Sequence, residues 1–323
     1  MDTGNTMTSS RTLLKQQFLE KSPFRGAREH SLKSDASFRH YSRLTLGNRT
    51  ALLMDAPPDK ESTTAFHQIA DILHAYQLTP PQILAADHQH GFLLLEDFGD
   101  DTYTQLLQQD PAQETALYSL AIDVLQYLHQ HPCPQNVPPY DAALLWREVE
   151  LFIDWALPAT ADKTTDKETL RASWQALWQP LLAPYTNPQT LVLRDYHVDN
   201  LMLLPHKIGL QQCGLLDFQD AVAGHPAYDV VSLLQDARRD ISPQLTETML
   251  ARYGNTSADF LNAYYILGTQ RAFKIVGIFN RLHQRDGKGH YLHHLPRVWH
   301  WIRLNCEQPI LAPVKAWLEE NIL

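Results

Sequence analysis

A group of polar residues between two apolar runs constrains this chain more than any other feature of its sequence. The segment "LVLRDYHVDNLMLL" (residues 191–204) begins and ends like a short buried strand, and between these runs stand Arg194, Asp195, His197 and Asn200. A tight turn accounts for an Asp and an Asn. It does not account for the Arg and the His beside them, so the following residues have to distinguish a turn from a reaction centre.

The residues that follow predict a hairpin with oxygen-bearing side chains at its open end. Asn200 begins one short strand, residues 207–211 contain the turn, and "CGLLDF" (213–218) returns as the partner strand. A hairpin of this size brings Asn200 and Asp217 close together. Asp195 lies five residues before Asn200, on the loop that leads into the same hairpin. Three oxygen-bearing groups are therefore expected to converge.

Such a convergence suits phosphoryl transfer, which needs positioning and charge neutralisation more than covalent help. Asn200 and Asp217 offer oxygen ligands to Mg²⁺ and leave coordination positions for water and for the phosphate oxygens of ATP. Asp195 is placed to accept the proton of an attacking hydroxyl. Arg194 and His197 offer positive charge or hydrogen-bond donors nearby. The alternative, turn and cap residues in a buried hairpin, explains each residue alone but not the whole pattern R-D-x-x-x-x-N followed by L-D-F.

The hydrophobic patterns divide the chain into a strand-rich beginning and a helical remainder. The predicted fold class is α+β, with a β-rich N-lobe (1–98) that binds the nucleotide and a mainly helical C-lobe (99–323) that carries catalysis and acceptor binding. A hinge is expected near residues 96–99. The N-lobe elements expected are a helix at 12–20, strands at 37–46 and 49–56, a helix at 61–78 and a strand pair within 83–98. The C-lobe helices expected include 111–130, 140–157, 227–237 and 266–284.

The composition of the chain limits which partners it is expected to bind and in which compartment it is expected. The 27 basic and 36 acidic residues give a net charge of −9, which argues against a general attraction to nucleic acid or to an anionic membrane. The three cysteines are widely spaced and form no zinc pattern, as is typical of a reducing compartment. The N-terminus lacks the apolar core of a signal peptide, and no run approaches the roughly 18 apolar residues of a membrane span. The expectation is a soluble, cytoplasmic protein.

Two stretches resemble a known superfamily. "RDYHVDNLMLL" and "LLDFQDAVAGHPAYDVVSLLQDA" are similar to the catalytic core of the aminoglycoside phosphotransferase and choline kinase superfamily, relatives of protein kinases. The resemblance implies a two-lobed protein-kinase-like fold and a phosphotransferase whose acceptor is an alcohol group. It implies that Asp195 is the catalytic base and that Asn200 and Asp217 are Mg²⁺ ligands. His197 falls where protein kinases have a phosphate-facing Lys, and Asp229 resembles the buried aspartate that braces the catalytic loop.

Five phrases resemble one branch of this superfamily, the anomeric N-acetylmuramate/N-acetylglucosamine 1-kinases of Gram-negative bacteria. They are "SDASFRHYSRL", "LLMDAPPDKE", "GFLLLEDFGDDTY", "LDFQDAVAGHPAYDVVSLLQDAR" and "IFNRLHQRDGKGHYLHHLPRV". This resemblance implies ATP-dependent phosphorylation of an amino sugar in the recycling of peptidoglycan. Two alternatives stay open: a kinase of the same fold for an aminoglycoside, choline-like or homoserine-like acceptor, and a non-catalytic nucleotide-binding module.

The chain departs from the superfamily pattern at two positions. Leu193 stands where the family has a histidine two residues before the base. Met54 stands where a protein kinase has its phosphate-binding Lys, so another basic group is needed to replace it. Arg39 and Arg43, on the preceding strand, are the candidates. The alternative for each is an ordinary solvated strand residue.

The remaining candidates for nucleotide binding lie in a turn and in the hinge. The turn at residues 34–38 has no G-x-G-x-x-G, but its backbone N–H groups, the Ser37 hydroxyl and the Phe38 region can close over phosphates. Glu96 and Asp97 in the hinge are expected to face solvent or to contact the ribose.

Three residues after the metal aspartate are candidates for acceptor binding. Gln219 and Asp220 follow Asp217 directly and are candidate contacts for sugar hydroxyls, although Asp220 suits a helix cap equally well. Arg238 is a candidate partner for the lactyl carboxylate of a muramate, against the alternative of an exposed helix end.

Overall fold

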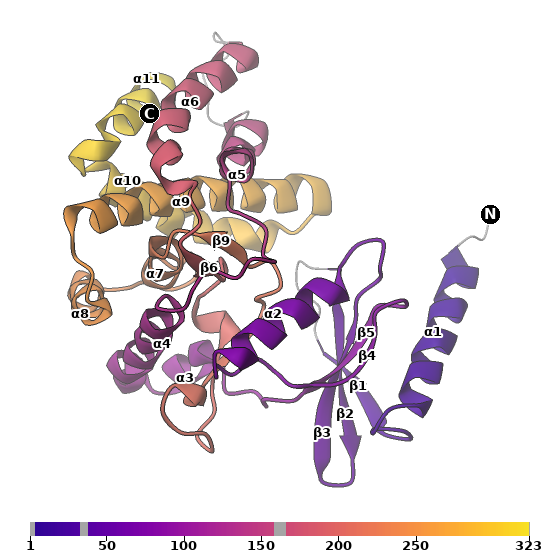
Figure 1. Ribbon diagram of the computed structural model, residues 1–323. Coiled ribbons are helices and arrows are strands. Elements are labelled where there is room, and N and C mark those ends of the chain that lie inside the picture. The colour runs from indigo at the N-terminus through magenta and orange to yellow at the C-terminus, as the bar shows by residue number, and fades with distance from the viewer. Residues whose placement is uncertain (1–3, 33–37, 158–165, 323) are drawn as a thin grey trace. The chain divides into compact units, whose positions relative to one another are not determined.

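The structure is a computed structural model, and it describes residues 4–32, 38–157 and 166–322. The chain divides into two compact units, residues 1–106 with 200–220 and residues 107–199 with 221–323. This division differs from a boundary at residue 98, because the hairpin after Asp195 groups with the strand-rich beginning of the chain. Figure 1 shows the five-stranded sheet of the first unit and the helices of the second.

The first unit is built on an antiparallel sheet with the strand order β1-β2-β3-β5-β4. Its strands are β1 (Arg28–Ser31), β2 (His40–Leu46), β3 (Arg49–Asp55), β4 (Ile83–Asp87) and β5 (Phe92–Glu96). The hairpin predicted at Gly47-Asn48 is confirmed, since Leu46 pairs with Arg49 across the turn. Gly47 takes φ +63°, a left-handed conformation that glycine adopts without strain. The predicted β4–β5 pair is also confirmed.

Both faces of this sheet are covered. The helices of the unit are α1 (Gly4–Glu20), α2 (Thr63–Ala75) and the first residues of α3 (Tyr103–Gln109). Phe18 of α1 packs with Leu53 and Phe92, and the two phenylalanine rings stack with centroids 5.7 Å apart. Side chains alternate along a strand, so Met54 and Leu93 point to the opposite face, where they are equally buried. The helix predicted at residues 12–20 is thus part of α1, and it packs on the sheet.

A second sheet of the first unit is the short hairpin β7–β8. Its strands are β7 (Leu201–Leu203) and β8 (Cys213–Leu215), with the 3₁₀ turns η4 (Val198–Asn200) before it and η5 (Gly209–Gln212) inside it. Bridges join Gly214 to Thr79 and Met202 to Thr102. The hairpin is thus anchored to the rest of its unit through both strands.

The second unit is helical and is organised around one long helix, α9. Its helices are α4 (Glu114–Leu128), α5 (Ala142–Trp155), α6 (Lys167–Leu182), α7 (Ala227–Leu234), α8 (Pro243–Tyr253), α9 (Ala258–Asp286), α10 (Leu295–Cys306) and α11 (Ala312–Asn321). Short 3₁₀ turns lie at η1 (Pro111–Gln113), η3 (Ala183–Tyr185), η6 (Gly289–His294) and η7 (Pro309–Leu311). Helix α9 packs against α5, α7 and α10. No helix in the described ranges has both the length and the apolarity that crossing a bilayer requires.

Two short strands complete the second unit and revise one prediction. Strand β6 (Thr190–Val192) pairs antiparallel with β9 (Val222–Gly224). The first apolar run of the 191–204 segment is therefore a strand, as predicted, but its partner lies beyond the β7–β8 hairpin. The two runs of that segment belong to two different sheets.

Aromatic side chains fill the core beside α9. Phe152 of α5, Trp174 of α6 and Phe273 of α9 pack with ring centroids between 4.8 and 5.3 Å apart. All three are fully buried. Aromatic rings of this size bury large apolar areas and prefer tilted or edge-to-face contacts. This cluster fixes α9 relative to α5 and α6.

Two glycines let α9 approach its neighbours closely. A Cβ at Gly268 would lie 2.5 Å from Val231 Cγ2 of α7, and one at Gly277 would lie 2.5 Å from the backbone of Leu151 in α5. Neither position accepts a larger residue without movement of the helices. The stretch of α9 between these two contacts is therefore held firmly, and it carries Arg271 and Lys274.

Candidate active site

The residues of the predicted constellation belong to two different units. Asn200 and Asp217 belong to the first unit, and Asp195 belongs to the second, five residues earlier in the chain. Each part has its own geometry and its own set of charged neighbours.

In the first unit, the β7–β8 hairpin brings Asn200 and Asp217 to its open end, as predicted. Leu201 pairs with Leu215, and the N–H of Leu216 donates to the Asn200 carbonyl at 2.9 Å. Asp217 takes φ +56°, a left-handed conformation that is uncommon for a residue with a side chain. Strained backbone of this kind occurs often at functional sites.

The Asp217 carboxylate is held between two donors. Arg39 NH2 lies 2.8 Å from Asp217 Oδ1, and Gln219 Nε2 donates to the same oxygen at 3.0 Å. Gln219 also donates to Asp220 Oδ2 at 3.1 Å. The Gln219 amide therefore orients the two carboxylates beside it. No helix begins after Asp220, since strand β9 follows, so its reading as a helix cap is wrong.

Arg39, a candidate to replace the Lys that the chain lacks, lies between two carboxylates. Besides contacting Asp217, its Nε lies 3.8 Å from Glu61 Oε2, and its side chain is only 10% exposed. Burial opposes the charge, but Tyr41, Asp217 and Glu61 together raise the pKa of Arg39 above its usual range, so the guanidinium stays protonated. Met54 is buried on the neighbouring strand, where its sulfur accepts a hydrogen bond from the Tyr41 hydroxyl at 3.2 Å.

Arg43, the other candidate, has a different set of contacts. Its guanidinium pairs with Asp97 at 2.8 Å and with Asp100 at 2.8 Å, and it donates to the Gly99 carbonyl at 3.1 Å. These bonds join strand β2 to the hinge. The Asp97 side chain is 3% exposed, so it does not face solvent; its other expected role, a contact with the ribose, stays a prediction. Of the two arginines, Arg39 alone contacts a residue of the predicted metal site within the described chain.

The other nucleotide-site candidates divide as follows. Ser37 lies outside the described residues. Phe38 is 56% exposed, with Lys60 Nζ 5.8 Å from its ring centroid. Glu96 accepts a hydrogen bond from the backbone N–H of Gln82 at 3.2 Å, which places its carboxylate beside the first residue of strand β4.

In the second unit, Asp229 braces the loop that carries Asp195. Its Oδ2 accepts from the N–H of Leu193 at 2.7 Å, and its Oδ1 accepts from the N–H of Arg194 at 2.8 Å. Asp229 is fully buried in the first turn of α7. The bracing role implied by the superfamily is thereby confirmed. Because these two hydrogen bonds fix the backbone of the loop directly, the loop does not need the family histidine at position 193 to hold it in place.

Arg194 faces a buried network that the sequence did not reveal. It takes φ +68°, and its guanidinium pairs with Glu148 of α5. Glu148 also accepts from the Tyr140 hydroxyl and pairs with Lys274 Nζ of α9 at 3.0 Å. Burial raises the pKa of Glu148, but Lys274 and Arg194 outweigh burial and lower it. The Arg194 guanidinium is therefore committed to this network, and its expected catalytic role stays a prediction.

Asp195 is surrounded by positive charge from α9 and from its own loop. Burial alone raises its pKa, but Lys274 and Arg271, followed by His197 and Arg194, outweigh burial and hold the pKa at about 2. Lys274 and Arg271 are one turn apart on α9, so they face the same side. The carboxylate is therefore ionised at neutral pH.

His197 and Arg238 form a second group near the same loop. Arg238 Nε pairs with Asp199 at 3.2 Å, and its NH1 lies 3.3 Å from His197 Nε2. Burial lowers the pKa of His197; Asp236 opposes this shift, and Arg238 adds to it. A lowered pKa favours the neutral ring. The two roles considered for His197, positive charge and hydrogen-bond donor, stay predictions.

The donor chemistry of the first unit fits a Mg²⁺ ion held jointly with a nucleotide. In the ranges that the structure describes, no group of three or more His, Cys, Asp or Glu side chains is arranged to hold a metal. Asn200 and Asp217 supply only two protein oxygens. Mg²⁺ commonly keeps one or two protein ligands and takes the others from water and phosphates, so this pair fits the ion.

The chain belongs to the phosphotransferase enzyme family, whose sequence model matches residues 30–264. It is a phosphotransferase of the kinase type. Among its relatives, the N-acetylmuramate/N-acetylglucosamine kinase of Caulobacter vibrioides is 35% identical, and the alignment covers 98% of each chain. A protein of the same name from Pseudomonas aeruginosa is 37% identical over 83% of this chain and 81% of that protein.

Solved structures confirm the predicted kinase-like fold. The choline kinase LicA from Streptococcus pneumoniae superposes with a TM-score of 0.63 at 12% identity, covering 91% of this chain and 99% of LicA. The ADP-bound aminoglycoside phosphotransferase APH(2'')-Ib gives a TM-score of 0.58 at 14% identity, covering 90% and 96%. At these identities the likeness concerns the fold alone.

Proposed function

We propose that this protein is an ATP-dependent kinase that phosphorylates the anomeric hydroxyl of N-acetylmuramate and N-acetylglucosamine. The observation that carries the acceptor is the similarity to N-acetylmuramate/N-acetylglucosamine kinases along 98% of the chain. The retained Asp195, Asn200 and Asp217 support catalysis rather than mere nucleotide binding, because a binding module needs no base. The role that follows is the salvage of cell-wall sugars in the cytoplasm.

The proposed reaction moves one phosphoryl group and one proton. The anomeric oxygen forms a bond to the γ-phosphorus, the bond from that phosphorus to the ADP oxygen breaks, and the hydroxyl proton passes to Asp195. With a pKa of about 2, Asp195 is too weak a base to deprotonate the sugar in advance. A loose transition state places little demand on the nucleophile until the phosphoryl group has largely left ADP, so late proton transfer to a weak base suits it.

The first unit is proposed to bind ATP. Asn200 and Asp217 would hold Mg²⁺, which neutralises charge on the phosphates when it is bound. Arg39, already placed against Asp217, is the proposed contact for the phosphate oxygens, since a guanidinium matches their geometry. Ser37, Phe38, Glu96 and the hinge backbone remain candidate contacts for the rest of the nucleotide.

The second unit is proposed to present the acceptor to Asp195. His197 is a candidate donor to a sugar oxygen, because its neutral ring carries one N–H. Arg238 lies beside His197 and is paired with Asp199. Gln219 and Asp220, although candidates for sugar contacts, have side chains already bonded to one another. Their proposed role is to support Asp217.

A panel of acceptors with MgATP tests the proposal. N-acetylmuramate and N-acetylglucosamine should be phosphorylated faster than kanamycin, choline and homoserine, and phosphorus NMR of the product should place the phosphate on the anomeric carbon's oxygen. The matched control is the methyl glycoside of N-acetylglucosamine, in which the anomeric oxygen is blocked; it should not react. Excess EDTA should stop turnover. Faster reaction of kanamycin or choline, or phosphorylation of the methyl glycoside, would contradict the proposal.

A further inference from the structure

The residue before the proposed base lies in a tight and strained turn. Arg194 takes φ +68°, and the N–H of Asp195 donates to the Leu193 carbonyl at 2.8 Å. A hydrogen bond between residues two apart, around a central residue of positive φ, indicates the rare and strained form of the γ-turn. Strained backbone persists only where the surrounding structure holds it firmly. The conformation of Arg194 determines the direction in which the chain enters Asp195.

Arg194 is held at three of its groups. Asp229 accepts from its N–H at 2.8 Å, and Ser232 Oγ donates to its carbonyl at 3.1 Å. Both partners are fully buried in α7. The third partner is Glu148 of α5, which pairs with the guanidinium. Helix α7 therefore fixes the backbone of Arg194, whereas α5 fixes its side chain.

Glu148 collects donors from several elements. Its Oε1 contacts Lys274 Nζ of α9 at 3.0 Å as well as the Arg194 guanidinium. Its Oε2 accepts from Gln270 Nε2 of α9 at 3.2 Å and also from the Tyr140 hydroxyl. Glu148 is 5% exposed. Four donors around one buried carboxylate use both of its oxygens and fix its position.

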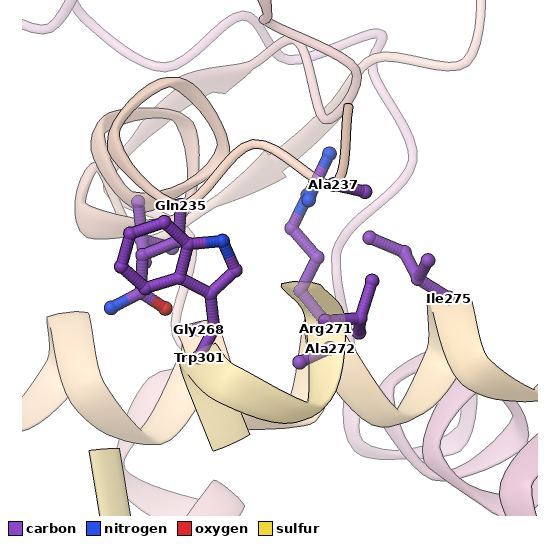
Figure 2. A pocket seen from close by; sticks show the side chains of 9 residues that line it. Gln235, Ala237, Gly268, Arg271, Ala272, Ile275 and Trp301 are labelled. Atoms are coloured by element: carbon purple, nitrogen blue, oxygen red, sulfur yellow. The ribbon is translucent and has the colours of Figure 1, made fainter. Parts of the chain in front are cut away.

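The helix that supplies two of these donors has little room to move. Gln235 at the C-terminal end of α7, Gly268 of α9 and Trp301 of α10 line a cavity of only about 10 Å³, which Figure 2 shows from close by. A space of this size holds roughly one water molecule. On α5, the Leu151 backbone would lie 2.5 Å from a Cβ at Gly277. The separation of α5 and α9, the two helices that form the network, is therefore closely fixed.

Stability alone does not explain a buried ion network of this kind. Removing charges from water is costly, and apolar side chains of similar volume often stabilise a fold equally well or better. Charged pairs do supply direction, since a guanidinium donates to a carboxylate in a fixed plane. The network therefore suits a place where geometry matters, and Arg194 is bonded covalently to the proposed base.

We propose that Glu148 is a positioning residue, which holds Arg194 in the strained turn and thereby aims the Asp195 carboxylate at the acceptor hydroxyl. This inference rests on the proposed function, because it assigns a supporting residue to the same reaction. In this role Glu148 acts only through Arg194. Without the pairing, the turn relaxes and the carboxylate moves, although Asp195 itself is unchanged.

Steady-state kinetics of Glu148→Gln in the intact enzyme tests the proposal. The amide keeps the size of the side chain but loses the charge and offers one accepting oxygen, so the Arg194 guanidinium should lose its fixed position. A displacement of about 1 Å at a reacting group can cost about 10²-fold, so kcat should fall by about 10- to 100-fold. The Kd for ATP should stay close to the wild-type value, because no residue proposed to contact the nucleotide has changed. A general loosening of the fold would weaken both.

A second variant keeps the test decisive if Glu148→Gln folds poorly. Glu148→Asp retains a counter-charge for the buried cations but is one methylene shorter, so the fold should be kept while the pairing with Arg194 is stretched. Its kcat should fall by less than that of Glu148→Gln, again with an unchanged Kd for ATP. Melting curves on the same preparations show that the folded protein is being compared.

A double-mutant cycle tests whether Glu148 acts through Arg194. Arg194→Met removes the guanidinium and keeps an unbranched side chain. Residues of one network have non-additive effects, so Glu148→Gln should lower kcat several-fold less in the Arg194→Met background than in the wild type. An equal fall in both backgrounds would show that Glu148 acts by another route, and it would overturn the proposal.

Glu150→Gln is the matched control, because it makes the same chemical change two residues further along α5. Glu150 pairs with Arg171 of α6, and its side chain is 24% exposed, so kcat should not change. An equal fall in kcat in this control, or wild-type kcat in both Glu148 variants, would overturn the proposal. All variants are compared on the acceptor that the wild type uses best. An acceptor other than the amino sugars would therefore overturn the proposed function and leave this comparison standing.

Discussion

Two aspartates of the site, Asp195 and Asp217, sit in opposite electrostatic settings. Asp217 is 39% exposed at the side chain, and it contacts one arginine directly at 2.8 Å. Asp195 lies among several cations of the second unit, which together hold its pKa at about 2. One carboxylate is partly open to solvent and is bonded to a nearly buried arginine. The other is surrounded by charges that belong to packed helices.

This difference matches the roles proposed for the two groups. A metal ligand has to accept an ion, so a carboxylate that solvent can reach is suitable. A proton acceptor in a kinase has to remain ionised and fixed while the acceptor hydroxyl arrives. Fixed cations serve that need, since they cannot leave. The comparison predicts that substitutions around Asp195 change the turnover rate and its pH dependence. Substitutions around Asp217 should instead weaken the binding of the nucleotide and of the metal.

The largest effect is expected from Asp195→Asn. The amide keeps the size and the hydrogen bonds but cannot accept the proton, so kcat should fall by about 10²- to 10⁴-fold. The Kd for ATP should barely change, because Asn200 and Asp217 remain. Enzyme kinetics, nucleotide titration and a melting curve on one preparation test this. If the variant turns over at the wild-type rate, Asp195 is only a turn residue, because Asn fits a turn as well as Asp does.

A smaller effect, on the nucleotide side, is expected from Arg39→Met. The change removes the cation that contacts Asp217 and Glu61. A hydrogen bond to a charged group contributes about 1.5–3 kcal/mol, so KM for ATP should rise by about 10- to 100-fold, and Arg39→Lys should recover part of it. Arg49→Met is the matched control, since Arg49 lies in the same sheet and donates to the Pro23 carbonyl. An unchanged KM for ATP in Arg39→Met would assign the phosphate contact elsewhere.

A shift in pH dependence is expected from Lys274→Met. Lys274 is the cation that lowers the pKa of Asp195 most, so its loss favours the protonated carboxyl and raises that pKa. In the wild type the rate should show no acid limb from Asp195 above about pH 4. In the variant the acid limb of the pH–rate profile should move upward by about one pH unit or more. Glu148 keeps one cationic partner in the variant, because Arg194 still pairs with it. A pH profile unchanged from the wild type would remove Lys274 from the environment of the base.

The low pKa of Asp195 also determines how the stability of the fold changes with pH. Because the folded pKa of Asp195 lies below the roughly 3.9 of an unfolded chain, its ionisation stabilises the fold above about pH 4. That contribution is lost as the pH falls toward about 2.

The smallest effect is expected from Gly277→Ala. The new Cβ would lie within 2.6 Å of the Leu151 backbone, so α9 and α5 must separate. Overpacking of this kind costs about 1–3 kcal/mol in the free energy of unfolding, which chemical denaturation measures. Gly289→Ala is the control: its nearest neighbour is a His283 ring atom at 3.3 Å, which can move aside. Equal stability of the two variants would contradict the close packing of α9 on α5.

The sequence predicted the elements whose signals are local. The β2–β3 turn, the β7–β8 hairpin and the meeting of Asn200 with Asp217 each depend on residues close together in the chain. Strand β1 was missed because "REHS" is polar and fully exposed, with no alternation to detect. Helix α1 was predicted to begin at residue 12 and begins at Gly4, since its first turns lack an apolar face.

The charged environment of Asp195 was not predictable from the sequence. Glu148, Arg271 and Lys274 lie far from Asp195 in the chain, on helices whose patterns are those of ordinary amphipathic helices. Only the packing of α9 against α5 and α7 turns these residues inward. The choice between Arg39 and Arg43 had the same difficulty, because it depends on which of them reaches Asp217, a residue of a distant hairpin.

The two glycine contacts of α9 have a consequence for how this enzyme can diversify. Because Gly268 and Gly277 bring the helix close to α7 and α5, and Phe273 and Gln270 between them also contact α5, α9 has little room to move when other residues of this stretch change. A lineage that keeps these four residues can therefore exchange other positions of the stretch without rebuilding its scaffold. Position 274 is more constrained, since its charge is shared with Glu148 and acts on the base.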